Sequence, residues 1–483
     1  MSKSIFKNAI YKTLLNLFNL VIPLIIGPYV VRVIGTELMG RISYTESINM
    51  YFAIFAGLGI YQYGIREISR IRDDKKKVNQ LFTSLFLLGV IANLIVTPAY
   101  LIYINIYFKG APAFPVMVIY AFNTALTAFY VEWMNEALED YDFITIKTII
   151  VRSIFIISTL LLIKNQQDFY KYVILNSVTL FLNYSISFAR IKRKVKFDFS
   201  NLTFTKHLKS LIFIVILSNA NTLYTILDKI MLGNHVSENA VSYYTYPQLV
   251  NSIVNNLLLS IVLVTVPRLS NLLGNNDEKQ YENLLNKICK TYLAFLFPAA
   301  IGIFILAKEI LILYGGGTQL VASTNVLRIF AAYMITAGFE SILTNQVMYV
   351  KRKERILVVF ILTFGLVNVV FKQILVRTGA LTPETAIATT TLANFLLITT
   401  EYLYINLKLK IKFSILDFGK LKYLLYSLAF IPISYVISLV FKGFFSYIML
   451  VVLVNGLYYF LVLYITKDEI LFTFLSKFMR KKS

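Results

Sequence analysis

The segment that decides the fold lies near the start of the chain, where residues 10–34 read IYKTLLNLFNLVIPLIIGPYVVRVI. Its only charged residues are Lys12 and Arg32, one close to each end. A membrane-spanning helix needs about 20 predominantly apolar residues, so this run is long enough to cross a bilayer. It lacks the short apolar core and small-residue cleavage site of a signal peptide. We therefore expect it to be retained as a first transmembrane helix.

Similar apolar blocks recur along the whole chain. Of the 483 residues, 58% are hydrophobic and 15% are charged, against about 25% charged in soluble domains. Blocks of this length are too long for barrel strands, and open sheets cannot cross lipid. The sequence predicts an all-α polytopic membrane protein with about 14 transmembrane helices. We expect spans over 10–34, 41–64, 80–107, 113–137, 146–164, 169–190, 208–231, 241–267, 288–308, 321–349, 356–376, 385–407, 422–441 and 446–466.

The basic residues are unevenly distributed between the connections. The net charge is +22, and alternate connections, counted from a cytoplasmic N-terminus, hold 35 of the 47 lysines and arginines but only 14 of the 25 acidic residues. Cytoplasmic loops of membrane proteins carry such an excess. We therefore expect a multi-pass membrane protein with both termini in the cytoplasm. The positive charge then reflects the orientation of the protein in the membrane, where the basic loops lie beside lipid headgroups. No nucleic-acid partner is expected.

The two halves of the chain resemble each other. Gly35, followed by Ser43-Tyr44, corresponds to Gly233, followed by Ser242-Tyr243. The offset of about 200 residues indicates parallel repeats, which in transporters form two bundles around a substrate path. We expect two parallel six-helix bundles plus two extra helices. The predicted divisions are 1–195 for the first bundle, 206–412 for the second, and 413–483 for the additional helices and a basic tail.

Catalytic and nucleotide-binding motifs are absent from the sequence. It has no phosphate-binding Gly-x4-Gly-Lys loop and no metalloprotease pattern. Its only cysteine is Cys289, so neither a disulfide nor a cysteine-based metal cluster can form within the chain. We expect a monomeric transporter, not an enzyme, with no metal site and no cofactor. Coupling to H+ or Na+ stays open. A membrane glycosyltransferase or polymerase is the alternative of another class, but the short outer connections disfavour it.

Ionisable residues inside membrane spans are expensive and are candidates for function. Guanidinium and ammonium groups suit an anionic headgroup, since arginine binds phosphate through two parallel hydrogen bonds. Carboxylates could carry a coupling cation or neutralise these bases when the site is empty. Buried structural pairing and snorkelling to the interface remain alternatives. The candidate headgroup-binding residues are Arg32, Arg152, Lys229, Arg328 and Lys372. The candidate coupling or neutralising acids are Glu46, Asp228 and Glu340.

A further cluster follows the fourth predicted span. Tyr130, Glu132, Trp133 and Glu136 combine aromatic rings with acids, and Glu139 lies one helical turn beyond them. Spacings of three and four residues would place these acids on one helical face. An aromatic and acidic site of this kind suits a quaternary amine such as choline. The alternative for the tryptophan is a place in the interfacial aromatic belt.

Three elements carry a family resemblance. They are Pro23-Leu-Ile-Ile-Gly-Pro28-Tyr-Val-Val-Arg32-Val-Ile-Gly35, Gly57-Leu-Gly59-Ile-Tyr-Gln-Tyr-Gly64-Ile-Arg66-Glu67 and Asp228-Lys-Ile-Met-Leu-Gly233. Together they resemble bacterial polysaccharide flippases of the multidrug, oligosaccharidyl-lipid and polysaccharide exporter superfamily. The resemblance implies a place in the bacterial plasma membrane and export of an undecaprenyl-diphosphate-linked oligosaccharide by alternating access. It also implies other polymer-assembly membrane proteins as partners.

Finer features favour one branch of that family. The stretch from Glu132 to Glu139 and the element Asn219-Ala-Asn221 are similar to flippases of teichoic-acid precursors. This similarity implies a teichoic-acid chain as cargo, with phosphocholine as a decoration. A multidrug or cation antiporter of the same fold and a peptidoglycan-precursor flippase are the alternatives within the superfamily.

Overall fold

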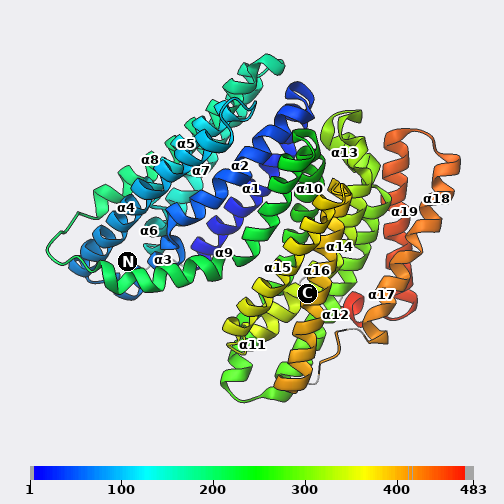
Figure 1. Cartoon of the computed structure of the whole chain (residues 1–483). Helices are drawn as coiled ribbons and strands as arrows, with labels where there is room; N and C mark the ends of the chain where they lie inside the picture. Colours follow the sequence, from blue (N-terminus) through cyan, green and yellow to red (C-terminus); the bar gives the residue numbers. More distant parts are fainter. Residues whose placement is uncertain (1–4, 412, 416, 474–483) are drawn as a thin grey trace. The chain divides into compact units, whose positions relative to one another are not determined.

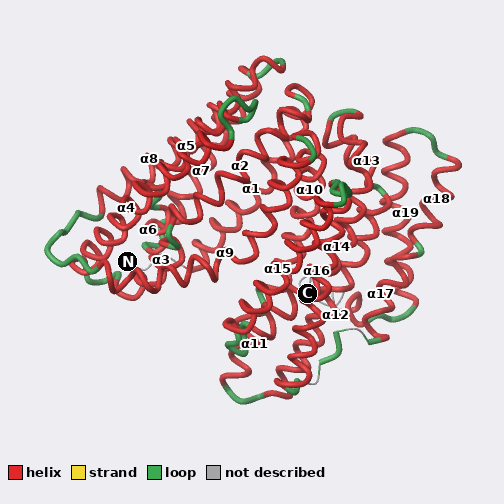
Figure 2. The backbone as a smooth tube through the Cα atoms, in the orientation of Figure 1, coloured by secondary structure: helices red, strands yellow, loops and turns green. Residues whose placement is uncertain are grey.

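The computed structural model describes residues 5–411, 413–415 and 417–473, and within these ranges every regular element is a helix. Figure 1 and Figure 2 show the helices, and Figure 2 shows no strand in the part that is described. The expected all-α class is therefore confirmed. The side chains of residues 5–9, 206, 213, 216–225 and 261 lie outside the description. Asn219 and Asn221 of the teichoic-acid resemblance fall in this group.

By packing, the chain divides into two units. The first comprises Met1–Ser242 together with Tyr314–Gln319, and the second comprises Tyr243–Leu313 and Leu320–Ser483. The short segment Tyr314–Gln319 thus belongs to the first unit, although the second unit surrounds it in sequence. The repeat-based divisions at 195, 206 and 412 stay predictions.

The first unit is built from nine helices of the described chain, shown from blue to green in Figure 1. Two single-turn 3-10 helices lie among them, at Thr127–Phe129 and Gln166–Asp168. The α-helices are α1 (Ile5–Ile34), α2 (Thr36–Gly57), α3 (Ile60–Ile71), α4 (Lys75–Tyr107), α5 (Phe114–Leu126), α6 (Glu132–Ala137), α7 (Tyr141–Leu162), α8 (Phe169–Lys194) and α9 (Phe204–His235).

The second unit takes up the remaining helices. Helix α10 (Glu238–Leu263) begins in the first unit and continues in the second. Leu343–Met348 and Ile405–Leu409 are π-helical, and Thr318–Ser323 forms a 3-10 helix. The other α-helices are α11 (Val266–Gly274), α12 (Glu278–Ile305), α13 (Ala307–Gly315), α14 (Thr324–Ile342), α15 (Glu354–Arg377), α16 (Pro383–Tyr404), α17 (Phe418–Leu428), α18 (Phe430–Val440) and α19 (Phe444–Ile465).

Ten segments of the described chain are long and apolar enough to cross a membrane. Each of the fourteen predicted spans overlaps a helix, but those that coincide with α2, α9, α10 and α16 are not among the ten. Exposed large apolar side chains are abundant, which fits a surface that faces lipid rather than water. The chain is a multi-pass membrane protein, and the number of 14 spans stays a prediction.

Two predicted spans are interrupted in the first unit. The span 41–64 is divided where Leu58 and Gly59 adopt left-handed backbone angles, with φ of 48° and 67°. A non-glycine residue rarely adopts this conformation, and two in succession end a right-handed helix. The span 113–137 is likewise divided between α5 and α6 by the turn at Thr127–Phe129. Hydropathy alone cannot reveal these breaks, because the apolar character continues through them.

Small residues allow close helix contacts in the first unit. A Cβ atom on Gly40 of α2 would lie 1.7 Å from the carbonyl oxygen of Glu238, and one on Gly233 of α9 would lie 2.1 Å from the ring of Tyr44. The Tyr44 hydroxyl donates a hydrogen bond to Asn234. Small side chains at such points let helix backbones approach each other, a common packing device in membranes.

Candidate functional site

A polar cavity of about 360 Å³ lies inside the first unit. Its wall is formed by α2, α5, α7 and α8, and most of its lining side chains can form hydrogen bonds. The lining residues are Glu46, Asn49, Met50, Ala53, Tyr120, Asn123, Arg152, Asn176, Thr179, Leu180 and Asn183. Amides and a guanidinium in the interior of a membrane helix bundle are unusual, because each polar group there must be satisfied by a partner.

Helix α2 provides the acidic side of the cavity. Asn49, Met50 and Ala53 lie three, four and seven residues after Glu46, so all four share one helical face. The Glu46 carboxylate accepts a hydrogen bond of 3.1 Å from the Tyr120 hydroxyl. The Asn49 amide donates to the Thr124 hydroxyl at 2.5 Å, which fixes its orientation on the wall. The Glu46 side chain is exposed to the cavity.

Helix α7 provides the basic side through Arg152. Its Nε atom is buried and has no hydrogen-bond partner among the described residues, and the same is true of the Asn123 Oδ1 atom. No salt bridge joins Arg152 to a described acid. Buried polar atoms without a partner mark places where a polar ligand can bind. The Arg152 Nε atom is therefore a donor that an anion could use, and the Asn123 Oδ1 atom is an acceptor that a hydroxyl group could use.

A second cation lies near Glu46. Lys229 of α9 is partly buried and interacts electrostatically with Glu46 and Asp228. Asp228 itself is fully buried. Helix α9 packs directly on α2, so the structure brings together four predicted residues, Glu46, Arg152, Asp228 and Lys229, in one part of the first unit. Of these four residues, Glu46 and Arg152 line the cavity, so an incoming phosphate would meet one acid and one base there.

Arg32 does not belong to this cluster. It lies in the last turn of α1 with its side chain exposed, beside Gly316. A Cβ atom on Gly316 would lie 2.3 Å from the Arg32 Nε atom. This contact, together with the 3.0 Å hydrogen bond from the Tyr314 hydroxyl to the Pro23 carbonyl, attaches Tyr314–Gln319 to α1.

Three predicted residues lie in the second unit, each in its own surroundings. Lys372 of α15 is fully buried and donates to the Thr390 hydroxyl of α16 at 3.0 Å. Glu340 of α14 accepts a hydrogen bond of 2.6 Å from Asn394. Arg328 contacts Asn325 at 3.2 Å and lies over the Phe304 ring. Thr390 and Asn394 are one helical turn apart on α16, so this helix engages both Lys372 and Glu340.

The acidic segment after α5 makes polar contacts with several neighbouring helices. Glu132 pairs with Lys147 of α7 at 2.8 Å, and Glu139 pairs with Arg72 at 2.5 Å. Asp140 accepts from Arg190 of α8 at 3.1 Å. The Glu136 carboxylate accepts a hydrogen bond of 2.6 Å from the Tyr61 hydroxyl. These contacts connect the segment to α3, α7 and α8.

The prediction of a single acidic helical face is wrong for this segment. Helix α6 ends at Ala137, and Glu139 has a left-handed φ of 56°, so Glu139 does not continue the face of Glu132 and Glu136. Trp133 is only 2% exposed, and its ring contacts Gly64 and Phe82. It therefore lies in the core of the unit, not in an interfacial belt. The choline site predicted from Tyr130, Glu132, Trp133 and Glu136 stays a prediction.

Sequence reasoning missed the uncharged members of the cavity. Asn176, Thr179 and Asn183 lie on one face of α8, and Tyr120 and Asn123 lie on α5. The headgroup and coupling candidates predicted from the sequence are all ionisable, whereas these residues are uncharged. Polar residues at helical spacing inside apolar blocks are a signal that would have found them.

Comparison with known proteins agrees with this architecture. Residues 5–273 match the family described as polysaccharide biosynthesis protein, and residues 214–374 match the MatE family. A protein of Escherichia coli (strain K12), described as a candidate O-antigen transporter, is 23% identical over 74% of this chain and 87% of its own length.

Solved structures show the same fold. The lipid II flippase MurJ in an inward-closed conformation has a TM-score of 0.73 at 16% identity, covering 96% of this chain and all of its own. A multidrug resistance MATE transporter in an inward-facing conformation has a TM-score of 0.62 at 15% identity, covering 82% of this chain and 94% of its own. Since the first family match spans more than half of the sequence, the chain belongs to the polysaccharide biosynthesis protein family.

Proposed function

We propose that this protein moves the polar headgroup of a lipid-linked oligosaccharide from the inner to the outer leaflet of the cell membrane. The cavity with Arg152, Glu46 and the surrounding amides is the observation that carries the proposal. Sugars and phosphates are costly to transfer into hydrocarbon without compensating hydrogen bonds. A guanidinium that binds phosphate and amides that bind hydroxyl groups replace the water that such a headgroup loses. The family and the O-antigen relative support the same class of cargo.

The finer form of the proposal concerns the lipid and the driving force. The cargo that we propose is a saccharide chain linked to undecaprenyl diphosphate. In the most detailed form of the proposal, this chain is a teichoic-acid precursor that bears phosphocholine. Alternating access would expose the cavity to one leaflet and then to the other. An inside-negative potential would favour export of a diphosphate with two charges by roughly 5 kcal/mol per 100 mV. Counter-transport of H+ or Na+ is then optional, and Glu46, Asp228 and Glu340 are the acids that could bind it.

The direct test is transport in proteoliposomes. Purified protein would be reconstituted with a fluorescent polyprenyl-diphosphate oligosaccharide, and arrival in the other leaflet would be followed by a membrane-impermeant quencher. Arg152→Ala should lower the transport rate by about a hundredfold, since a charged hydrogen-bond partner is worth roughly 3 kcal/mol. Arg377→Ala is the matched control, because Arg377 is exposed at the end of α15 and makes no salt bridge with a described residue.

Two outcomes would contradict the proposal. Wild-type rates in Arg152→Ala would remove the role of the guanidinium in headgroup binding. No transport of this lipid by the wild-type protein, combined with altered drug susceptibility of cells that lack it, would favour a multidrug antiporter instead. The match of residues 214–374 to the MatE family is the observation on which that second function rests.

A further inference from the structure

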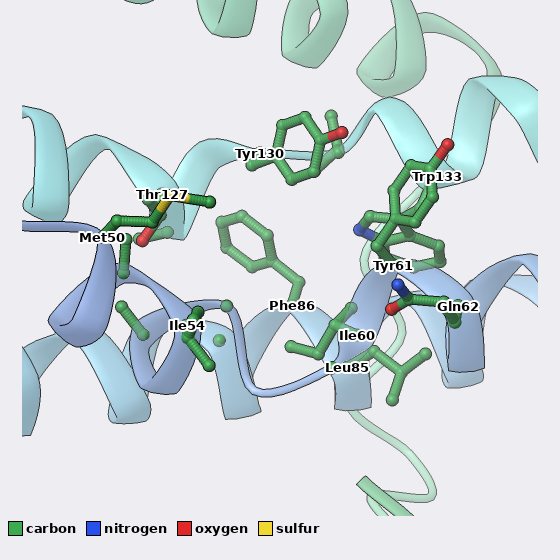
Figure 3. A pocket seen from close by; sticks show the side chains of 17 residues that line it. Met50, Ile54, Ile60, Tyr61, Gln62, Leu85, Phe86, Thr127, Tyr130 and Trp133 are labelled. Carbon is green, nitrogen blue, oxygen red and sulfur yellow. The ribbon is translucent and has the colours of Figure 1, made fainter. Parts of the chain in front are cut away.

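A second pocket lies in the first unit, at the break between α2 and α3. It has a volume of about 290 Å³, and Figure 3 shows the side chains around it. Besides α2 and α3, its wall is formed by α4 and by the turn that leads from α5 into α6. The lining residues are Met50, Ala53, Ile54, Ala56, Gly57, Gly59, Ile60, Tyr61, Gln62, Leu85, Phe86, Gly89, Thr127, Ala128, Tyr130, Val131 and Trp133. This volume is at the lower end of the range of small-molecule sites.

The broken helix creates the space. Because Leu58 and Gly59 end α2 with left-handed angles, the next residues leave the axis of α2. A Cβ atom on Gly57 would meet nothing within 4 Å, so this glycine faces open space, and its own φ is not in the left-handed region. Discontinuous helices of this kind form binding sites in membrane transporters, where their freed peptide groups are available to a ligand.

Aromatic rings form one side of the pocket. The Tyr61 and Tyr130 rings are nearly parallel, at 17°, with their centroids 6.0 Å apart, and Tyr130 also contacts Tyr184 at 5.0 Å. Figure 3 shows Tyr130, Phe86, Tyr61 and Trp133 around the space. Aromatic faces bind the C–H surface of a sugar ring as well as cations and apolar groups, so the rings alone do not identify the occupant.

Charge and hydrogen bonding distinguish these occupants. None of the lining residues is charged. The nearest carboxylates already have partners, since Glu132 pairs with Lys147 at 2.8 Å and Glu136 accepts from the Tyr61 hydroxyl. A phosphate would therefore find no positive charge in the lining, and a quaternary ammonium ion would find no carboxylate there. The Gln62 side chain and the Tyr130 hydroxyl add hydrogen-bonding groups to the rings. The Tyr61 and Thr127 hydroxyls donate to Glu136 and Asn93, so they offer a sugar only their acceptor lone pairs. This combination suits an uncharged, polyhydroxylated ring better than a purely apolar chain.

The pocket continues from the polar cavity along α2. Met50 and Ala53 line both spaces. Glu46, which faces the polar cavity, and Gly57, which faces the pocket, are eleven residues apart on one helix, or about 16 Å at 1.5 Å per residue. An extended oligosaccharide whose phosphate end lies at Arg152 could therefore reach the pocket with a sugar further along its chain.

We propose that this pocket is a saccharide subsite, which binds an uncharged sugar ring of the cargo at a distance from the diphosphate. The inference rests on the proposed function and adds a selectivity element to it. The polar cavity recognises what every lipid-linked cargo shares, and the pocket at the helix break recognises the glycan that distinguishes one cargo from another.

Gly57→Leu tests the subsite directly. The leucine side chain should fill the open space without backbone strain, since Gly57 is helical. Gly456→Leu in α19 is the matched control, because a Cβ atom there also meets nothing within 4 Å and Gly456 does not line the pocket. Both variants would be assayed in proteoliposomes with two substrates, polyprenyl diphosphate carrying the full oligosaccharide and the same lipid trimmed to its first sugar.

We expect Gly57→Leu to slow transport of the full substrate by about tenfold to a hundredfold, the discrimination that one pocket contact provides. Transport of the trimmed lipid should be unchanged, and Gly456→Leu should move both substrates like the wild type. Equal loss of both substrates, or loss of neither, would overturn the subsite. If the wild-type protein moved neither lipid, the proposed function itself would fail, which separates the two ideas.

Trp133 gives a binding measurement that does not depend on transport. It is the only tryptophan of the chain and it lines the pocket. Addition of free oligosaccharide, released from the lipid, should change the Trp133 fluorescence up to a plateau in the wild type and in Gly456→Leu. The same addition should cause no change in Gly57→Leu. A response to choline with none to the oligosaccharide would assign the pocket to a quaternary amine and overturn the proposal. No response to either would also overturn it.

Discussion

At the scale of single residues, two cations on α7 have opposite surroundings. Lys147 is 4% exposed and contacts Glu132 and the Ser187 hydroxyl, each at 2.8 Å. Arg152 lies five residues later, lines the polar cavity, and has a buried Nε atom without a partner in the described chain. The paired Lys147 stabilises the helix packing, whereas the unpartnered Nε atom of Arg152 leaves a donor that a ligand could use. Their positions in the sequence could not separate these roles, because the partner of Lys147 comes from another helix.

Lys147→Ala should strongly destabilise the protein. Removing one partner of a buried ion pair leaves the Glu132 charge without compensation, which typically costs about 3–5 kcal/mol. Thermal unfolding in detergent should show a clear drop in Tm. Lys147→Met combined with Glu132→Gln should recover most of the loss, because it buries no net charge.

The exposed Lys77–Asp74 pair provides the comparison. Both side chains are largely solvent-accessible, so Lys77→Ala should leave the Tm nearly unchanged. A Tm for Lys147→Ala equal to that of Lys77→Ala would show that the Glu132–Lys147 contact contributes little.

At the scale of elements, the apolar pattern predicted where helices lie but not where they bend. Every predicted span overlaps a helix. A block of about 20 apolar residues must pair its backbone groups internally when it lies in lipid, and a helix does so. The break at Leu58–Gly59 depends on left-handed backbone angles at these two residues, and hydropathy carries no information about backbone angles. The sequence Gly57-Leu-Gly59 is the local signal that was available for it. Helix α2 carries Glu46 and Asn49, so the polar residues that line the site also lower its hydropathy and weaken its detection as a span.

Gly40→Ala should weaken the contact of α2 with the start of α10. The new methyl group would lie 1.7 Å from the backbone carbonyl of Glu238, which cannot move aside as a side chain could. We expect a lower Tm and reduced yield of folded protein, since overpacking commonly costs about 1–3 kcal/mol.

Gly302→Ala in α12 is the matched control, because its Cβ atom would meet nothing within 4 Å. Alanine is also the better helix former, so this control should be neutral or slightly stabilising. Equal Tm values for Gly40→Ala and Gly302→Ala would show that the close approach at Gly40 is not required.

At the scale of the whole molecule, topology follows from charge. The distribution of basic residues among the connections predicts that the loop between α8 and α9 faces the cytoplasm. It predicts that the turn between α7 and α8 faces the outside of the cell. Cys289 is fully buried, so replacing it with serine gives a background without reactive thiols. In that background, Gln167→Cys should be labelled by a membrane-impermeant maleimide in intact cells. Asn201→Cys, at a position that is also exposed, should be labelled only after the cells are opened. The reverse pattern would invert the predicted orientation.

The attachment of Tyr314–Gln319 to the first unit has a consequence for synthesis. A ribosome that has finished the first unit's main segment at Ser242 must add about 77 more residues before this segment exists. At common elongation rates this is a delay of roughly 4–15 s. During that interval Gly27 lacks its Tyr314 neighbour and Arg32 lacks its Gly316 neighbour. The first unit therefore cannot complete this contact until most of the chain up to Gln319 has been synthesised.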